Sequence, residues 1–177
     1  MLVKSEEDLT VDALRKEDIR QSFLQAMRLH TSTVAIITKA HEGSALGMTA
    51  TAICSLSADP PAILTCINLN ATICRWLTIG AKLCINLLTE EHSVVAQGFA
   101  GKLPAHERFQ SGHWSYNDEG VPYLQDLLSS IFCRVDSRIE YNTHAILACL
   151  VEGTFNSKSR SPLLYSEGIF RTVGGAA

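Results

Sequence analysis

Short apolar, β-branched runs separated by brief turns constrain the fold of this chain most strongly. Most connections between neighbouring runs are shorter than a parallel crossover, which needs a dozen or more residues, so we expect antiparallel pairing. Strands in this number, with two or three helices interspersed, predict a mainly β fold whose sheet closes or nearly closes into a barrel. The runs typical of strands span residues 31–40, 47–58, 61–68, 82–88, 130–141, 143–155 and 162–170.

The N-terminal part is polar and then helical in pattern. Residues 1–16 are expected to form a mobile leader, and residues 17–177 a single domain. A helix is predicted from about Glu17 to His30, because apolar residues recur there at helical spacing. The apolar stripe, which we expect to pack in the core, consists of Ile19, Phe23, Leu24 and Met27.

Three further segments interrupt the strands. Residues 71–80 predict a short helix with Gly80 just past its end. Residues 89–101 predict a second helix, with Thr89 as its N-cap. Residues 101–125 are rich in glycine, proline and aromatic side chains and predict a long loop, and such loops are often functional. Residues 156–161 predict a turn.

Composition excludes several classes of protein. The 177 residues fit one domain, and 46% hydrophobic with 19% charged residues predict a globular chain. A net charge of −3 argues against a nucleic-acid-binding surface, although one phosphate could still meet a local basic pocket. The sequence contains neither a long uncharged apolar run nor the apolar core of a signal peptide, so we expect a cytoplasmic protein that does not enter membranes.

No metal site or familiar catalytic motif is predicted. The sequence has no C-x-x-C pair, no histidine pair at helical spacing, no phosphate-binding P-loop and no G-x-G-x-x-G. The cysteines are expected to be buried free thiols, consistent with a reducing compartment. They are Cys54, Cys66, Cys74, Cys84, Cys133 and Cys149.

The run 47–58 raises a functional question, because one of its two faces is small and apolar and the other carries four hydroxyls. The apolar set begins with Met48 and Ala50, and the hydroxyl set is Thr49, Thr51, Ser55 and Ser57. The hydroxyl face meets either water or a polar ligand. Together with CINLNAT and QGFAG, it would suit a planar ligand that carries a phosphate, the simpler alternative being a strand facing solvent.

The ordered set of segments resembles the short-chain flavin reductase family. The set comprises GMTATAICSLSADPPAILTCINLNAT, KLCINLL, FAG, ERF, THAILACLVEG and PLLYSEGIF, over roughly residues 20–171. The resemblance implies an antiparallel split β-barrel that binds flavin mononucleotide, usually as a homodimer. It also implies hydride transfer from NADH or NADPH to FMN or FAD, and delivery of reduced flavin to a separate monooxygenase. Reductase components of two-component aromatic hydroxylases, such as 4-hydroxyphenylacetate 3-monooxygenase, are the most similar, which implies a part in aromatic degradation.

The resemblance also implies a set of flavin-binding residues. Those expected along the ring are Thr49, Ala50, Thr51 and Ala52, with Ser55 and Leu56 at the ribityl and phosphate end. The rest of the pocket would be Cys66, Ile67, Asn68, Asn70, Thr72, Asn86, Phe99, Ala100 and Gly101. Arg108 is implied as the charge partner of a phosphate or of the nicotinamide nucleotide, the alternative being an exposed surface arginine.

Three positions depart from the family pattern. His144 matches the histidine near which nicotinamide approaches, but Asn142 stands where the family has glycine before it. Asparagine tolerates left-handed backbone angles, so the turn can survive, and a histidine that packs in the core or caps a turn is the alternative. Leu69 replaces a residue that is often basic, and Cys149 one that is often glycine.

The implied reaction places little demand on side chains, because the cofactor carries the chemistry and the protein positions it. His144 would place the nicotinamide, and backbone N–H groups near N1 and O2 would stabilise reduced flavin. Three alternatives fit the same barrel. They are a tightly bound FMN oxidase of the pyridoxamine-phosphate type, a flavin-binding module without NAD(P)H turnover, and a structural dimer with an empty pocket.

Overall fold

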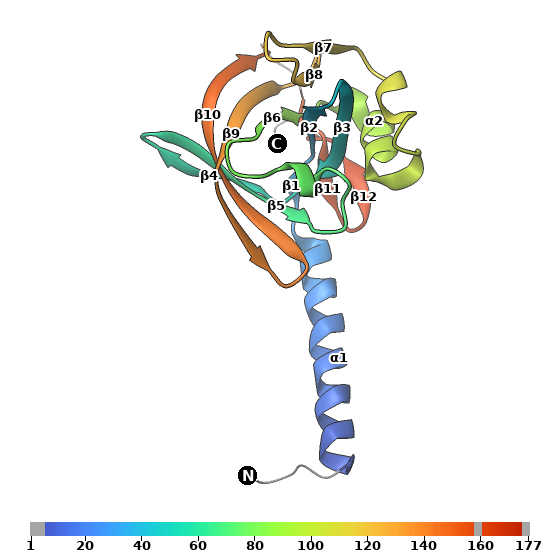
Figure 1. Ribbon diagram of the computed structural model, residues 1–177. Helices are drawn as coiled ribbons and strands as arrows, with labels where there is room; N and C mark the ends of the chain where they lie inside the picture. The colour runs from blue at the N-terminus through green and yellow to red at the C-terminus, as the bar shows by residue number, and fades with distance from the viewer. Residues whose placement is uncertain (1–5, 158–160, 175–177) are drawn as a thin grey trace.

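A seven-stranded sheet organises the molecule (Figure 1). The computed structural model describes residues 6–157 and 161–174. The strand order is β3-β2-β6-β9-β10-β5-β4, and every neighbouring pair is antiparallel, as predicted. Its strands are β2 (Ala35–His41), β3 (Ser44–Ala50), β4 (Ile53–Ala58), β5 (Pro61–Asn68), β6 (Lys82–Leu87), β9 (Ser129–Tyr141) and β10 (His144–Asn156).

Two small sheets complete the β structure of the described residues. Strands β1 (Ser32–Thr33), β11 (Leu164–Ser166) and β12 (Ile169–Arg171) form one. Strands β7 (Trp114–Tyr116) and β8 (Pro122–Leu124) form the other. Segment 101–125, predicted as a loop, therefore contains a hairpin. The turn predicted at 156–161 lies partly outside the described residues.

The run 47–58 was predicted as one strand, and this prediction is wrong. It forms the end of β3 and all of β4, with a break at Thr51 and Ala52. β3 pairs with β2 at one edge of the sheet, and β4 pairs with β5 at the other. The chain thus joins the two edges at this corner, which requires the sheet to curl. The two edges are not paired with each other among the described residues, so the predicted closure into a barrel is not observed.

Two apolar clusters pack on opposite faces of β2. Ala35 and Ile37 belong to the first cluster, which lies inside the curl of the large sheet. Val34 and Ile36 belong to the second, which the segments after β6 and β8 cover. Because side chains alternate along a strand, β2 is buried on both faces. β2 therefore packs against the rest of the large sheet on one face and against the irregular segments on the other.

The N-terminal helix differs from its prediction in both length and packing. α1 spans Glu6–Leu29, so it includes most of the predicted leader, whose residues 1–5 lie outside the described part. Figure 1 shows α1 projecting from the sheets as a rod. Its stripe does not enter the core: Ile19 is 61% and Phe23 60% exposed, and Leu24 and Met27 are exposed as well. The helical spacing was correct, but residues 6–157 and 161–174 supply no surface that covers this face.

The remaining helical segments are short. The helix predicted at 71–80 is a single 3-10 turn, η1 (Cys74–Trp76), and the chain turns at Gly80 with φ +84°. The helix predicted at 89–101 is a composite of η2 (Glu90–His92), α2 (Ser93–Gln97) and a π-helical turn, η3 (Gly98–Lys102). Thr89 precedes it as predicted, and its hydroxyl lies 2.8 Å from Nδ1 of His92. A last 3-10 turn, η4, spans Arg108–Gln110.

A buried asparagine fastens three strands together. Asn86 on β6 is fully buried, and its Nδ2 donates to the carbonyl oxygen of Ile36 at 2.9 Å and to Oγ1 of Thr38 at 3.1 Å. Its Oδ1 accepts the backbone N–H of Leu124 on β8 at 2.9 Å. These bonds tie β6 to β2 and to the β7–β8 hairpin. Asn86 was predicted to bind the cofactor, and the structure places it in the interior, where protein groups use both ends of its amide.

Replacing Asn86 by alanine is expected to lower the free energy of unfolding by about 1–3 kcal/mol, because the Leu124 N–H and the Ile36 carbonyl lose a partner in the interior. Urea unfolding measures this change. Asn156→Ala, which removes an exposed amide bonded to Ser129, is the matched control and should change stability little. An Asn86→Ala protein of unchanged stability would contradict the structural part assigned to this side chain.

Candidate functional site

Two hollows flank the corner where β3 passes into β4, and they contain many of the predicted site residues. The first, here called the Arg108 hollow, has a volume of about 270 Å³. It gathers side chains from β3, from the loop after β5, from η3 and from η4. The predicted residues that line it are Thr49, Asn70, Thr72, Phe99, Ala100, Gly101 and Arg108.

Arg108 is held in place at this hollow. Its Nε donates to the carbonyl oxygen of Leu103 and its Nη1 to that of Gly47, each at 3.2 Å. The side chain is partly buried, which corrects the alternative of an exposed surface arginine. A guanidinium has five N–H donors, and those not directed at the two carbonyls can bind an anion.

Close aromatic packing shapes the wall of the Arg108 hollow. Phe99 is almost fully buried and contacts Phe109 edge-on, with ring centroids 4.9 Å apart, while Trp114 lies 5.3 Å from it. A Cβ atom added to Gly47 would lie 2.6 Å from Phe99 Cε1, so glycine is required for this approach. Gly101, inside η3, adopts φ +109°, which kinks the chain at the rim of the hollow.

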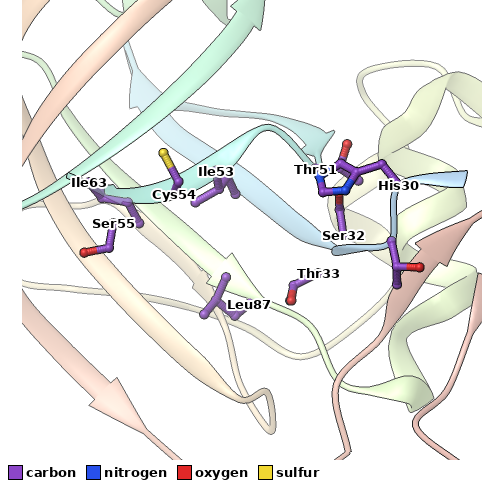
Figure 2. A pocket seen from close by; sticks show the side chains of 10 residues that line it. His30, Ser32, Thr33, Thr51, Ile53, Cys54, Ser55, Ile63 and Leu87 are labelled. Atoms are coloured by element: carbon purple, nitrogen blue, oxygen red, sulfur yellow. The ribbon is translucent and has the colours of Figure 1, made fainter. Parts of the chain in front are cut away.

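The second hollow, here called the His30 hollow, has a volume of about 400 Å³. Figure 2 shows His30, Ser32 and Thr51 grouped on one side of it, with Cys54 and Ser55 on the other. Thr51 and Ser55 were predicted as site residues. The remaining lining residues are Thr31, Thr33, Ile53, Ile63 and Leu87.

Three of the four hydroxyls of residues 47–58 divide between the two hollows, whereas Ser57 lines neither and bonds to the backbone of Asp59. Thr49 lines the Arg108 hollow, and its Oγ1 donates to the carbonyl oxygen of Ala96 at 2.6 Å. Thr51 and Ser55 line the His30 hollow. Two residues of strand span about 7 Å, so Thr49 and Thr51 bring the hollows close together along the chain. One elongated polar ligand could reach both.

Several predicted residues lie outside the hollows. Ala50 and Ile67 are buried in the first apolar cluster. Leu56 is 50% exposed and occupies a bulge between Ser55 and Ser57 of β4. Three others border the corner or the loop without lining either hollow, namely Ala52, Cys66 and Asn68.

Asn68 nevertheless supports the loop after β5, because its Oδ1 accepts the backbone N–H of Asn70 at 2.9 Å. Leu69, at a position where the family often has a basic residue, packs against the first apolar cluster. Arg108 is the cation that lines the Arg108 hollow.

His144 lies at the start of β10, exposed, opposite Asn68 of β5 in the ladder. Its Nδ1 is 2.8 Å from Oγ1 of Thr143, and the Thr143 carbonyl accepts the backbone N–H of Leu69 at 3.0 Å. Asn142 adopts φ +51°, so it takes the left-handed conformation that the sequence analysis expected of it. The turn thus holds His144 beside the loop of the Arg108 hollow, and the alternative of a core histidine is excluded.

Sequence reasoning missed the segment from His30 to Thr33. It joins α1 to β2 and lines the His30 hollow, but we had assigned it only to a helix end and a strand. A signal was present, since Thr31, Ser32 and Thr33 place three hydroxyls directly before a buried strand.

All six cysteines are free thiols, of which four are buried, Cys66 is half-buried and Cys54 is exposed. Burial raises the pKa of the Cys133 and Cys149 thiols to about 12, and it raises the pKa of Cys84 further. Cys54 in the His30 hollow is exposed, which corrects the expectation that the cysteines are buried. Cys149 fills a core position where the family often has glycine.

The described residues contain neither a metal-binding cluster nor a helix suited to cross a membrane. No group of three histidine, cysteine or acidic side chains gathers there to hold a metal ion. None of the helices in this part of the chain combines the length and the apolar character needed to span a bilayer.

Known proteins resemble this chain over most of its length. The family model described as "Flavin reductase like domain" matches residues 27–174. An FMN reductase (NADH) RutF 1 of Methylorubrum extorquens is 40% identical over 152 residues, covering 86% of this chain and 76% of that protein. The FMN reductase (NADH) RutF of Agrobacterium fabrum is 31% identical over 172 residues, covering 97% and 99%.

Solved structures agree with this result. The crystal structure of a protein from Haemophilus somnus 129pt, described as a flavin reductase, superposes with a TM-score of 0.82 at 33% identity, covering 86% of this chain and 98% of that one. Flavin reductase PheA2 superposes with a TM-score of 0.78 at 26% identity, covering 87% and 97%.

Replacing Gly47 by alanine is expected to lower the free energy of unfolding by about 1–3 kcal/mol, because the added methyl group meets the buried Phe99 ring. Thermal or urea unfolding measures this change. Gly153→Ala is the matched control, since nothing lies within 4 Å of its added Cβ, and it should be tolerated. Equal stability of the two variants would show that Phe99 does not need Gly47.

Proposed function

The chain belongs to the flavin reductase like domain family, and on this premise we propose that it is an NADH-dependent flavin reductase. It takes hydride from NADH, passes it to FMN or FAD, and releases the reduced flavin. The observation that carries the proposal is the pair of hollows on one strand corner, with a fixed cation at one and a hydroxyl-lined wall at the other.

We place the flavin across this corner. Arg108 and the hydroxyl of Thr72 bind the phosphate in the Arg108 hollow, next to the turn at Gly101. Thr51 and Ser55 hold the polar edge of the ring at the His30 hollow, so Ser55 is reassigned from the phosphate end, where the resemblance had placed it. Small residues at the corner let the backbone approach the ring. When both nucleotides are bound, nicotinamide C4 supplies the hydride and flavin N5 accepts it.

The side chains orient the two nucleotides and need not act as nucleophiles. His144 is a positioning residue for the nicotinamide, supported by its fixed place at the tip of the β9–β10 hairpin. The exposure of Thr51, Ser55 and His144 supports a site that exchanges its flavin. This favours a reductase that releases its product over an oxidase with tightly bound FMN.

Three further features of the family are proposed, each from one observation. A split barrel is supported by the corner at Thr51 and Ala52, where the chain passes directly from one edge of the sheet to the other. A homodimer is supported by the exposed apolar stripe of α1, which a second copy would cover. A cytoplasmic location is supported by the six free thiols.

A separate flavin-dependent monooxygenase is the proposed recipient of the reduced flavin, and aromatic degradation is the proposed setting. The supporting observation is again the open site, because a reductase that gives up its product needs a second enzyme to use it.

Anaerobic turnover tests the function. The purified protein with NADH and excess FMN should bleach many equivalents of FMN, followed at the visible flavin band. His144→Ala is expected to raise the KM for NADH about tenfold with a smaller change in kcat, since it removes a group that positions the donor. His113→Ala, an exposed histidine elsewhere, is the control.

Bleaching no faster than in protein-free solution, with flavin still bound, would overturn the reductase assignment in favour of a binding module. A His144→Ala protein with unchanged kinetics would overturn the part assigned to this side chain alone.

Thiol labelling tests the placement of the flavin without turnover. Cys54 should react first with iodoacetamide at pH 8, because it is exposed, while the raised pKa of Cys133 and Cys149 keeps them unreactive. Saturating FMN should slow the labelling of Cys54, measured by mass spectrometry of its peptide. Labelling at the same rate with and without FMN would contradict the placement of the ring at the His30 hollow.

A further inference from the structure

A third hollow lies on the other side of η3 from the strand corner. With a volume of about 540 Å³, it is larger than either of the two hollows assigned to the flavin, and within the range of small-molecule sites. The short α2–η3 segment forms one wall and the β11–β12 hairpin the other (Figure 1). Here called the Tyr165 hollow, it is lined by Ser93, Gln97, Lys102, Tyr165, Ile169 and Phe170.

The Tyr165 hollow adjoins the Arg108 hollow. Ala100 lines both, so the two are separated by the width of a single turn of backbone. Lys102 follows directly after Gly101, which is at the rim of the Arg108 hollow. A phosphate chain that leaves Arg108 past Ala100 would therefore meet a second cation, Lys102, on entering the Tyr165 hollow.

The hairpin wall presents aromatic side chains that are not fully buried in the core. Tyr165 is 39% exposed and Ile169 is also exposed. Phe170 packs partly against the second apolar cluster, which anchors the hairpin, and its ring centroid lies 5.5 Å from that of Tyr165. An exposed aromatic face on an anchored ring pair suits a stacked planar base.

The opposite wall carries polar groups. Lys102 Nζ donates to Oε1 of Gln97, so the ammonium group is held beside the amide. Ser93 adds a hydroxyl on the same segment. A cation, an amide and a hydroxyl facing an aromatic pair are the groups that bind a phosphate, a ribose and the edge of a purine.

We propose that the Tyr165 hollow binds the adenylate half of a dinucleotide, whether that of FAD or that of NADH. This rests on the proposed function, because the flavin half of FAD or the nicotinamide half of NADH must lie at the strand corner for the hollows to act together. Tyr165 stacks on the adenine, and Lys102 pairs with its phosphate. FMN lacks the adenylate and binds without using this hollow.

Variants of the two walls test the proposal. Tyr165→Ala and Lys102→Gln should each weaken binding of the adenylate-bearing nucleotide about tenfold, within the range observed when a stacked base loses its aromatic partner. Binding of FMN should be unchanged. Tyr116→Ala is the matched control for the first variant, since Tyr116 is also an exposed tyrosine on a three-residue strand. Lys16→Gln on α1 is the control for the second.

Two pairs of ligands identify the source of the adenylate. Dissociation constants for FAD and FMN are measured by flavin fluorescence, and KM values for NADH and reduced nicotinamide mononucleotide with FMN as acceptor. If the variants bind FAD more weakly but bind FMN as the wild type does, the hollow belongs to FAD. If the variants have a higher KM for NADH but an unchanged KM for the mononucleotide, the hollow belongs to NADH.

Other outcomes overturn the proposal. Equal losses for both members of a pair, or no loss in either variant, would show that the hollow does not recognise adenylate. Unfolding midpoints of the variants confirm that each remains folded. Failure of the proposed function would differ from both results, because wild-type protein would then not reduce FMN with either hydride donor.

Discussion

The amide of Asn86 is the interaction on which the site depends. It holds β6 against β2 and fixes the backbone of Leu124, which ends the β7–β8 hairpin. That hairpin presents Trp114 to Phe99, and Phe99 forms the wall of the Arg108 hollow. A polar group with all its bonds made in the interior specifies one arrangement, because any shift would leave buried donors and acceptors unpaired. The irregular segment 101–125 thereby gains a defined place over the sheet.

The small residues of β3 have a physical explanation in this arrangement. Gly47 lies against the Phe99 ring, which leaves no room for a Cβ atom, and Ala50 on the opposite face is buried in the first cluster. Thr49, on the same face of β3 as Gly47, lines the Arg108 hollow, and Thr51, just past the end of β3, lines the His30 hollow. β3 therefore packs Ala50 into the core on one face and presents a hydroxyl next to a glycine on the other. The break at Thr51 and Ala52 lets the chain pass from one edge of the sheet to the other.

The departures from the family pattern are accommodated locally. Asn142 keeps the left-handed turn that glycine would otherwise supply, so the hairpin that carries His144 is preserved. Leu69 gives up a positive charge and gains a place against the core. Arg108 and, in the neighbouring hollow, Lys102 supply cations on the segment that follows α2. These two side chains are the cations that line the two hollows.

The sequence by itself determined most strands of the large sheet, their antiparallel pairing and most of the residues around the Arg108 hollow. Alternation of side chains, turn residues and the ordered segments from 47 to 108 are local features, which can be recognised along the chain. Only the tertiary structure decided that residues 47–58 form two strands at opposite edges, because pairing partners lie far apart in sequence. It also decided that Asn86 is interior, that the α1 stripe is exposed, and that His30 joins the site. Burial depends on what packs against a side chain, and one segment does not contain that information.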